Sequence, residues 1–287
     1  MICKTQQDYD GMRLAGKITG EALKYAKSLI RPNISTLELD KMIEKFIIDK
    51  GAIPSFKGYD GFPASICASV NEMVVHGIPS NDIILKEGDI VSIDLGVIIN
   101  GYNGDAARTF AVGKIDSEKA RLIEVTKDCF FKGINKLSVG AKLGELSHAI
   151  QCHAELNGYS VVRELVGHGI GHDMHESPEV PNYGNPTSGI RVKDGMCLAV
   201  EPMINMGSRY VALKDDSWGV YAIDHKPSAH YENTVIVTSK GVEITTMYEG
   251  ENEDRWHCCF NRRSWYGRVV CCRKHSWRLC VFGRWKV

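Results

Sequence analysis

The stretch from Lys86 to Gly113, KEGDIVSIDLGVIINGYNGDAARTFAVG, contains two strand-like runs separated by turn residues. The first run, Ile90 to Ile99, is almost wholly apolar, and the letters Asn-Gly-Tyr-Asn-Gly follow it. Asn and Gly adopt backbone conformations with positive φ more easily than other residues, and such residues connect the strands of tight hairpins. The stretch therefore predicts a β-hairpin with its turn at Asn100-Gly101.

Two aspartates lie inside this predicted hairpin: Asp94 interrupts the apolar strand and Asp105 opens the second one. With the turn at Asn100-Gly101, Asp94 lies opposite Ala107, and Asp105 is its diagonal neighbour on the same face, about 7–8 Å away. A carboxylate among Ile and Val is costly to bury unless a cation or a polar partner compensates it. The pair is therefore either a cation site or two buried acids held by backbone or arginine contacts.

The overall composition is that of an ordinary globular protein, with 44% hydrophobic and 24% charged residues among 287. The first residues, MICKTQQDYD, lack the basic and apolar regions of a secretory signal, and no run of about 18 apolar residues could cross a membrane. We therefore expect a cytoplasmic protein without membrane contact. The five cysteines before residue 200 are scattered without metal or disulfide spacing, so free thiols are expected.

The composition changes abruptly near residue 250, which predicts a fold over residues 1–250 and a separate basic tail over 251–287. Nine Lys or Arg and no Asp or Glu follow residue 254, whereas the part before carries 26 basic and 35 acidic residues. Five of the ten cysteines and four of the five tryptophans also fall in the tail, without the CxxC spacing of a zinc site. Basic and aromatic residues together could bind nucleic acid or the ribosome surface. We favour the alternative, an unselected end outside the fold.

Helix and strand patterns occur twice in the same order. Apolar periodicity and capping residues predict helices over 8–30, 35–50, 116–137 and 143–156. A shift of 107 residues superposes the second helix on the fourth, with Glu, Leu, Ile and Gly at matching sites. Further strands are expected near 160–166, 196–204, 220–224 and 231–238, with loops at 167–175 and 177–190. The predicted fold is α+β, with two similar helix–helix–strand halves around a central antiparallel sheet.

Three more polar residues stand where the second half would present them: His168 in the segment VGHGIGH, Glu201 after an apolar strand and Glu232 at the start of another. With Asp94 and Asp105 they form a set of four carboxylates and one imidazole, which suits Mn, Fe, Co or Zn ions. Four carboxylates repel each other unless about four positive charges offset them, so two divalent ions fit better than one. Two such ions can share a hydroxide and polarise an acyl or phosphoryl oxygen, which predicts a hydrolase.

In this order the five residues resemble the dinuclear site of the pita-bread metallopeptidases, and the chain resembles the type I methionine aminopeptidases among them. The segments that carry the resemblance are NEMVVHGIP, DIVSIDLGVIINGYNGDAARTF, GHGIGHDMHESPEVPNYG, LAVEPMI and the strand at Glu232. The resemblance covers about residues 5–250. It implies a pita-bread fold and an aminopeptidase, expected to be a monomer, that removes the initiator methionine from nascent polypeptides with a small second residue, at or near the ribosome.

The resemblance also implies a role for each ligand. Asp94 would bind one metal ion through both oxygens, Asp105 and Glu232 would bind both ions, and His168 and Glu201 would complete the shell of the second. Glu201 would keep an oxygen toward the reacting water and could carry its proton. The two ions would be Co, Mn, Fe or Zn.

Substrate contacts follow from the same resemblance. His76 and His175 match the two histidines that hold the scissile amide and stabilise the tetrahedral intermediate. The pocket for the methionine side chain would be built from Tyr59, Phe62, Cys67 and Trp218. Phe56 and Met174 depart from the family pattern, where Cys and an aromatic residue are common, but both remain apolar. Selectivity for methionine should therefore survive in a pocket of altered shape.

Three alternatives belong to the same fold. Proline-directed relatives, the prolidases and aminopeptidase P, carry an additional N-terminal domain for which this chain shows no sequence. Type II methionine aminopeptidases have a helical insertion that the 33-residue interval from His168 to Glu201 does not accommodate. A binding module that has lost its ligands would be expected to lack several of the five, and all five are present.

Overall fold

The computed structural model describes residues 1–251, and Met1–Tyr248 form one compact unit. The basic tail falls almost entirely outside the described residues, so the predicted boundary and the nature of the tail stay predictions. The helices are α1 (Gln6–Leu29), α2 (Thr36–Asp49), α3 (Ser117–Ile134), α4 (Leu143–Leu156) and the short 3₁₀ helix η1 (Tyr59–Gly61). None of the helices within residues 1–251 is both long and apolar enough to cross a membrane.

The strands are short except for the central hairpin. They are β1 (Ile53–Pro54), β2 (Ile66–Val70), β3 (Met73–Val75), β4 (Ile90–Ile99), β5 (Tyr102–Ala111), β6 (Ser160–Val161), β7 (Gly167–Gly169), β8 (Glu176–Val180), β9 (Met196–Val200), β10 (Met203–Asn205), β11 (Val211–Leu213), β12 (Val220–Ala222), β13 (Ser228–His230), β14 (Asn233–Thr238) and β15 (Gly241–Ile244). All strand pairs that they form are antiparallel.

The hairpin predicted from Lys86–Gly113 is confirmed as β4 and β5. Asn100 and Gly101 form the turn with φ of 52° and 76°, and Asp94 pairs with Ala107. The residues on either side of Asp94 in β4 are fully buried in the core beneath α1 and α2. Because side chains alternate along a strand, Asp94 points to the opposite face, away from these helices.

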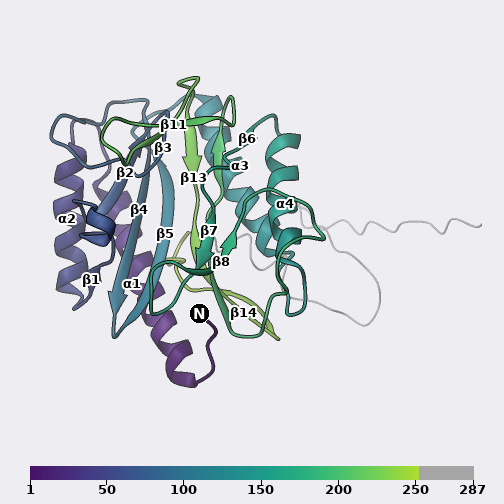
Figure 1. Cartoon of the computed structure of the whole chain (residues 1–287). Coiled ribbons are helices and arrows are strands. Elements are labelled where there is room, and N and C mark those ends of the chain that lie inside the picture. Colours follow the sequence, from purple (N-terminus) through teal and green to yellow (C-terminus); the bar gives the residue numbers. More distant parts are fainter. Residues whose placement is uncertain (252–287) are drawn as a thin grey trace, which may run out of the picture. The chain divides into compact units, whose positions relative to one another are not determined.

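The predicted internal repeat is confirmed in the helices. A shift of 107 residues carries α2 onto α4 with both ends in register, and the glycines that follow, Gly51 and Gly158, have φ of 74° and 83°. Such a glycine terminates a helix at low conformational cost. The same shift carries Asp94 onto Glu201, so the two halves each place a carboxylate at an equivalent point. In Figure 1, α1 and α2 lie with the strands of the hairpin on the left, and α3 and α4 lie with strands of the second half on the right.

The predicted central sheet is built of two sheets that meet at a seam. Strands β1, β2, β4 and β5 form one, and β15-β14-β9-β7-β8 form the other in that order. At the seam the N–H of Glu232 donates to the carbonyl of Ala107 at 2.9 Å, and the N–H of Asp105 donates to Thr234 Oγ1 at 2.9 Å. These bonds bring Asp105 and Glu232, which are far apart in sequence, to the same place.

Two segments expected to be loops contain strands. Gly167–Gly169 is β7 and Glu176–Val180 is β8, and β7 lies between β8 and β9. Gly and Pro disfavour strands in general, which is why the sequence pattern indicated loops. Here the glycines allow close packing: a Cβ added at Gly167 or at Gly169 would lie 2.4 Å from a neighbouring carbonyl oxygen. His168 between them is thereby fixed within a sheet.

Candidate functional site

The predicted site residues line one cavity of about 260 Å³ where the two sheets meet. The cavity walls include all eleven: Tyr59, Phe62, Cys67, His76, Asp94, Asp105, His168, His175, Glu201, Trp218 and Glu232. Phe56, Asp60 and Met174 complete the lining. One end is acidic and the other is apolar, so the cavity can hold cations beside an apolar side chain.

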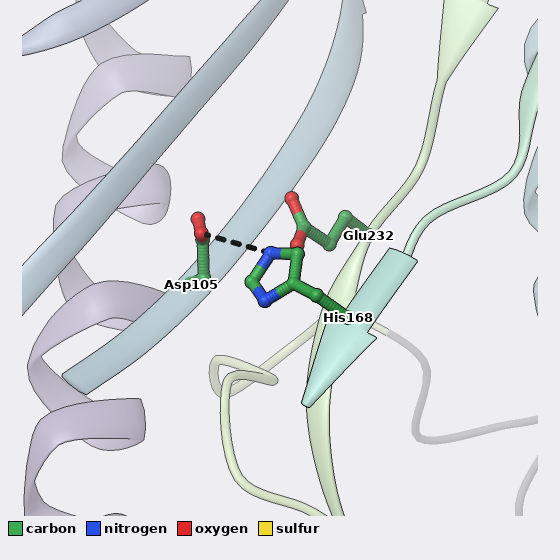
Figure 2. A group of neighbouring side chains, drawn as sticks. All are labelled: Asp105, His168 and Glu232. Carbon is green, nitrogen blue, oxygen red and sulfur yellow. Dashed lines mark ion pairs between the residues drawn. The ribbon is translucent and has the colours of Figure 1, made fainter. Parts of the chain in front are cut away.

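The acidic end is assembled from both halves. Figure 2 shows Asp105 on β5, His168 on β7 and Glu232 just before β14 pointing toward one another. One potential ligand atom from each of these three lies within 4.8 Å of the others. His168 Nε2 is 3.9 Å from Asp105 Oδ2 and 3.7 Å from Glu201 Oε1. The separations leave room for a cation between the side chains.

The carboxylates are buried without enough positive charge around them. Burial raises the pKa of Asp105 to about 7, and burial together with neighbouring carboxylates raises the pKa values of Asp94, Glu201 and Glu232 well above their usual range. Asp94 Oδ1 and Asp105 Oδ1 are buried and have no hydrogen-bond partner within residues 1–251. Buried polar atoms are almost always paired, so such an arrangement fits a bound cation.

The imidazole of His168 is suited to be a metal ligand. Its Nδ1 lies 2.9 Å from the carbonyl oxygen of Gly169, which fixes the proton on Nδ1 and leaves the lone pair of Nε2 facing the carboxylates. Burial, followed by the nearby His175, lowers the pKa of His168 to about 4. The ring is therefore neutral near pH 7, as metal coordination requires. The site thus offers four carboxylates and one imidazole nitrogen as possible metal ligands.

Two further histidines stand beside the acidic end. His76 follows β3 with φ of 57°, a conformation that costs energy for a residue other than glycine and that is frequent at functional sites. His175 precedes β8, its ring packs edge-on against His168 at 4.3 Å between centroids, and its Nδ1 lies 2.9 Å from the hydroxyl of Tyr59. Burial lowers the pKa values of both His76 and His175. As neutral rings they can each donate one hydrogen bond.

The apolar end forms a small pocket directly next to the acids. Phe62 and Trp218 meet edge to face with ring centroids 5.1 Å apart. The buried members of this pocket are Phe56, Phe62, Ala64, Cys67 and Met174. Cys67 is paired with Asp94 across β2 and β4, so the pocket wall and the acidic end share neighbouring strands. Burial raises the pKa of the Cys67 thiol well above its usual range, and the neutral thiol is an apolar wall.

Two residues near the site were not predicted from the sequence. Arg108 is 3% exposed; its guanidinium donates to the carbonyl of Glu232 and, at 2.7 Å, to Asn233 Oδ1. His230 is 2% exposed and its Nε2 lies 3.8 Å from Glu201 Oε2. A single Arg or His in a strand carries no local sequence signal of function. Their closeness to the site becomes visible only in the structure, where β5 and the segment around Glu232 lie next to each other.

Comparisons with known proteins agree with this geometry. Residues 10–239 match the model of metallopeptidase family M24. Methionine aminopeptidase of Clostridium acetobutylicum is 52% identical over 87% of this chain and 100% of its own length. The enzyme of the same name from Clostridium perfringens is 54% identical over 86% of this chain and 99% of its own length. The crystal structure of methionine aminopeptidase from Rickettsia prowazekii, 45% identical, covers 86% of this chain and all of its own with a TM-score of 0.84.

Proposed function

The chain belongs to metallopeptidase family M24, and we propose on that premise that it is a methionine aminopeptidase, a metal-dependent hydrolase that releases N-terminal methionine from polypeptides. The single observation that carries the proposal is that an acidic end and an apolar end lie next to each other in one cavity. Four buried carboxylates and an imidazole form one end, and a pocket of Phe, Trp, Cys and Met side chains forms the other. The first suits cations and the second suits an apolar side chain.

The four carboxylates and the imidazole support the binding of two divalent ions. Co, Mn, Fe and Zn are the candidates, because all four accept oxygen and nitrogen ligands. Asp94 would hold one ion, Asp105 and Glu232 would contact both, and His168 and Glu201 would hold the other. When bound, such ions polarise a carbonyl group and lower the pKa of water. The unpaired, buried oxygens of Asp94 and Asp105 support this assignment, because a cation would compensate both of them.

The substrate would enter with its methionine side chain among Phe62, Cys67 and Trp218. The apolar walls and the aromatic edges favour an unbranched thioether over a charged side chain. His76 and His175, which are neutral and at the side of the acidic end, would donate hydrogen bonds to the scissile amide and to the oxyanion that forms from it. A small second residue is expected because that side chain must fit beside the carboxylates.

Proton transfer is assigned to Glu201. The attacking water loses a proton and the departing amine gains one, and a carboxylate within about 2.6–3.2 Å of both can carry it. Glu201 faces His168 through Oε1 and His230 through Oε2, at 3.7 and 3.8 Å, so its two oxygens have different neighbours. One oxygen would hold a cation, and a lone pair of the carboxylate that remains free would accept the proton.

The cellular setting is part of the proposal. The substrates would be the N-termini of nascent polypeptides, met in the cytoplasm near the ribosome by a monomeric enzyme. Nucleic-acid contact is expected only if the basic tail supplies it. Salt-dependent retention on RNA by the full chain, lost when it ends at residue 250, would support such a role. Equal retention of the two forms would exclude it.

The substrate is tested by incubating the metal-reconstituted chain with the peptides Met-Ala-Ser and Ala-Pro-Ala. The proposed function predicts release of free methionine from the first peptide and little cleavage of the second. Cleavage of Ala-Pro-Ala alone would favour a proline-directed peptidase of the same fold. Binding of metal without cleavage of either peptide would indicate a non-catalytic module.

A further inference from the structure

His230, the last residue of β13, places its buried ring beside two carboxylates of the acidic end, Glu201 and Glu232. Its Nε2 lies 3.8 Å from Glu201 Oε2 and 4.0 Å from Glu232 Oε2. The side chain is 2% exposed, and neither ring nitrogen has a hydrogen-bond partner within residues 1–251. An unpaired polar group in the interior lowers the stability of a protein, so this ring reduces the stability of the fold unless it gains a partner.

The backbone of His230 is held firmly while its ring is not. The N–H of His230 donates to Thr109 Oγ1 at 2.8 Å, and the same hydroxyl lies 2.9 Å from the carbonyl oxygen of His230. Thr109 Oγ1 also contacts Ser92 Oγ at 2.8 Å across β4 and β5. Hydrogen bonds to β5 therefore fix the backbone of His230, and β5 is itself bonded to β4. The position from which the ring faces the two carboxylates is fixed in this way.

We propose that His230 is a positioning residue for Glu201: as a neutral imidazole with its proton on Nε2, it donates a hydrogen bond to Oε2. Oε1, which faces His168, is then the oxygen left for a cation. Hydrogen bonds span about 2.7–3.2 Å, so Glu201 has to approach the ring by less than about 1 Å. The inference rests on the proposed metal centre, and outer hydrogen bonds of this kind orient metal-binding carboxylates in proteins generally.

The chemistry of the neighbours favours donation over coordination. Both groups that face Nε2 are carboxylates, which accept hydrogen bonds, and the guanidinium of Arg108 binds the backbone carbonyl of Glu232 nearby. A protonated Nε2 satisfies these neighbours and cannot simultaneously bind a metal ion. Glutamine can place an N–H₂ group at a similar distance, whereas leucine fills the space without a donor.

The test compares His230→Gln and His230→Leu with the parent chain, and uses His148→Leu on the exposed face of α4 as the matched control. Calorimetric titration of each metal-free protein with Co²⁺ gives metal affinity independently of activity, and the absorption spectrum of the Co²⁺ form reports the ligands. We expect His230→Leu to lose about 10–100-fold in metal affinity. His230→Gln and the control should stay within about threefold of the parent, with unchanged spectra.

Two outcomes would overturn the assignment. Parent-like metal affinity and turnover in His230→Leu would show that the ring does nothing for Glu201. An equal loss in both His230 variants, with a changed Co²⁺ spectrum in each, would show that His230 binds the metal directly. Thermal unfolding of the metal-free variants shows whether they fold. If the parent chain itself neither binds Co²⁺ nor releases methionine, the proposed function fails, which is distinct from a failure of His230 alone.

Discussion

Replacing Asp105 by asparagine should stabilise the metal-free protein, and the gain should grow with pH. Burial raises the pKa of Asp105 from 3.8 to about 7, so the folded chain holds the carboxyl proton more tightly than the unfolded chain does. The protonated form is therefore favoured in the fold. Its contribution to stability is fully present below about pH 4 and is lost as the pH rises toward 7. Asparagine has nearly the same shape and never ionises.

The size of the effect follows from the shift in pKa. A difference of about 3 units at about 1.4 kcal/mol per unit corresponds to about 4 kcal/mol of unfolding free energy by pH 8. Burial lowers the pKa values of His168 and His230 to about 4 and about 3, so these rings add stability as the pH rises to about 6.5. Both proteins contain these histidines, so their contribution largely cancels in the difference between variant and parent.

The assay is urea unfolding of both proteins in a strong chelator at several values between about pH 4 and pH 8. The Asn variant and the parent should have similar unfolding free energies near pH 4. The variant should be more stable by about 3–4 kcal/mol near pH 8. With saturating divalent metal the order should reverse, because the ions need the ionised carboxylate. A difference that is flat with pH in chelator would refute the claim that Asp105 is buried with uncompensated charge.

Three other substitutions separate the roles assigned to the site. Glu201→Gln should lower kcat by about 10²–10⁴ while calorimetry still detects bound metal, and near-normal turnover would place the proton carrier elsewhere. Tyr59→Phe keeps the ring but removes the hydroxyl that holds His175, so kcat should fall about 3–10-fold with KM unchanged in peptide kinetics. Arg108→Leu leaves the buried carbonyl of Glu232 without its donor, so urea unfolding should show a loss of about 1–3 kcal/mol, whereas an unchanged free energy of unfolding would contradict this role of Arg108.

The parts of the fold that local chemistry determines could be predicted from the sequence. Ser35 and Asp116 accept hydrogen bonds from the N–H groups of Glu38 and Lys119, as expected for residues that begin helices. The hairpin register followed from one Asn-Gly turn and from alternation along the strands. That register alone placed Asp94 and Asp105 on one face, before any relative was considered.

The parts that depend on distant contacts could not be predicted in this way. The seam between the sheets relies on a threonine hydroxyl and on Arg108, which meet backbone groups more than 120 residues away. Strands β7 and β8 consist largely of Gly, Pro and charged residues, whose preference for loops is overridden because β7 pairs with β9 and β8 pairs with β7. The sequence did not indicate a role for His230 because Glu201, the nearer of its two carboxylate neighbours, is distant in the sequence. The roles of His76 and His175 came from the resemblance to a family.

The most direct test of the account is methionine release measured while the metal-free chain is titrated with Co²⁺ or Mn²⁺. Met-Ala-Ser serves as substrate, and calorimetry under the same conditions gives the number of ions bound. The account predicts no release in chelator and activity that rises as the site fills, with Asp94→Asn requiring more metal for the same rate. Full methionine release by the thoroughly chelated chain would contradict the proposal that these carboxylates act through bound cations.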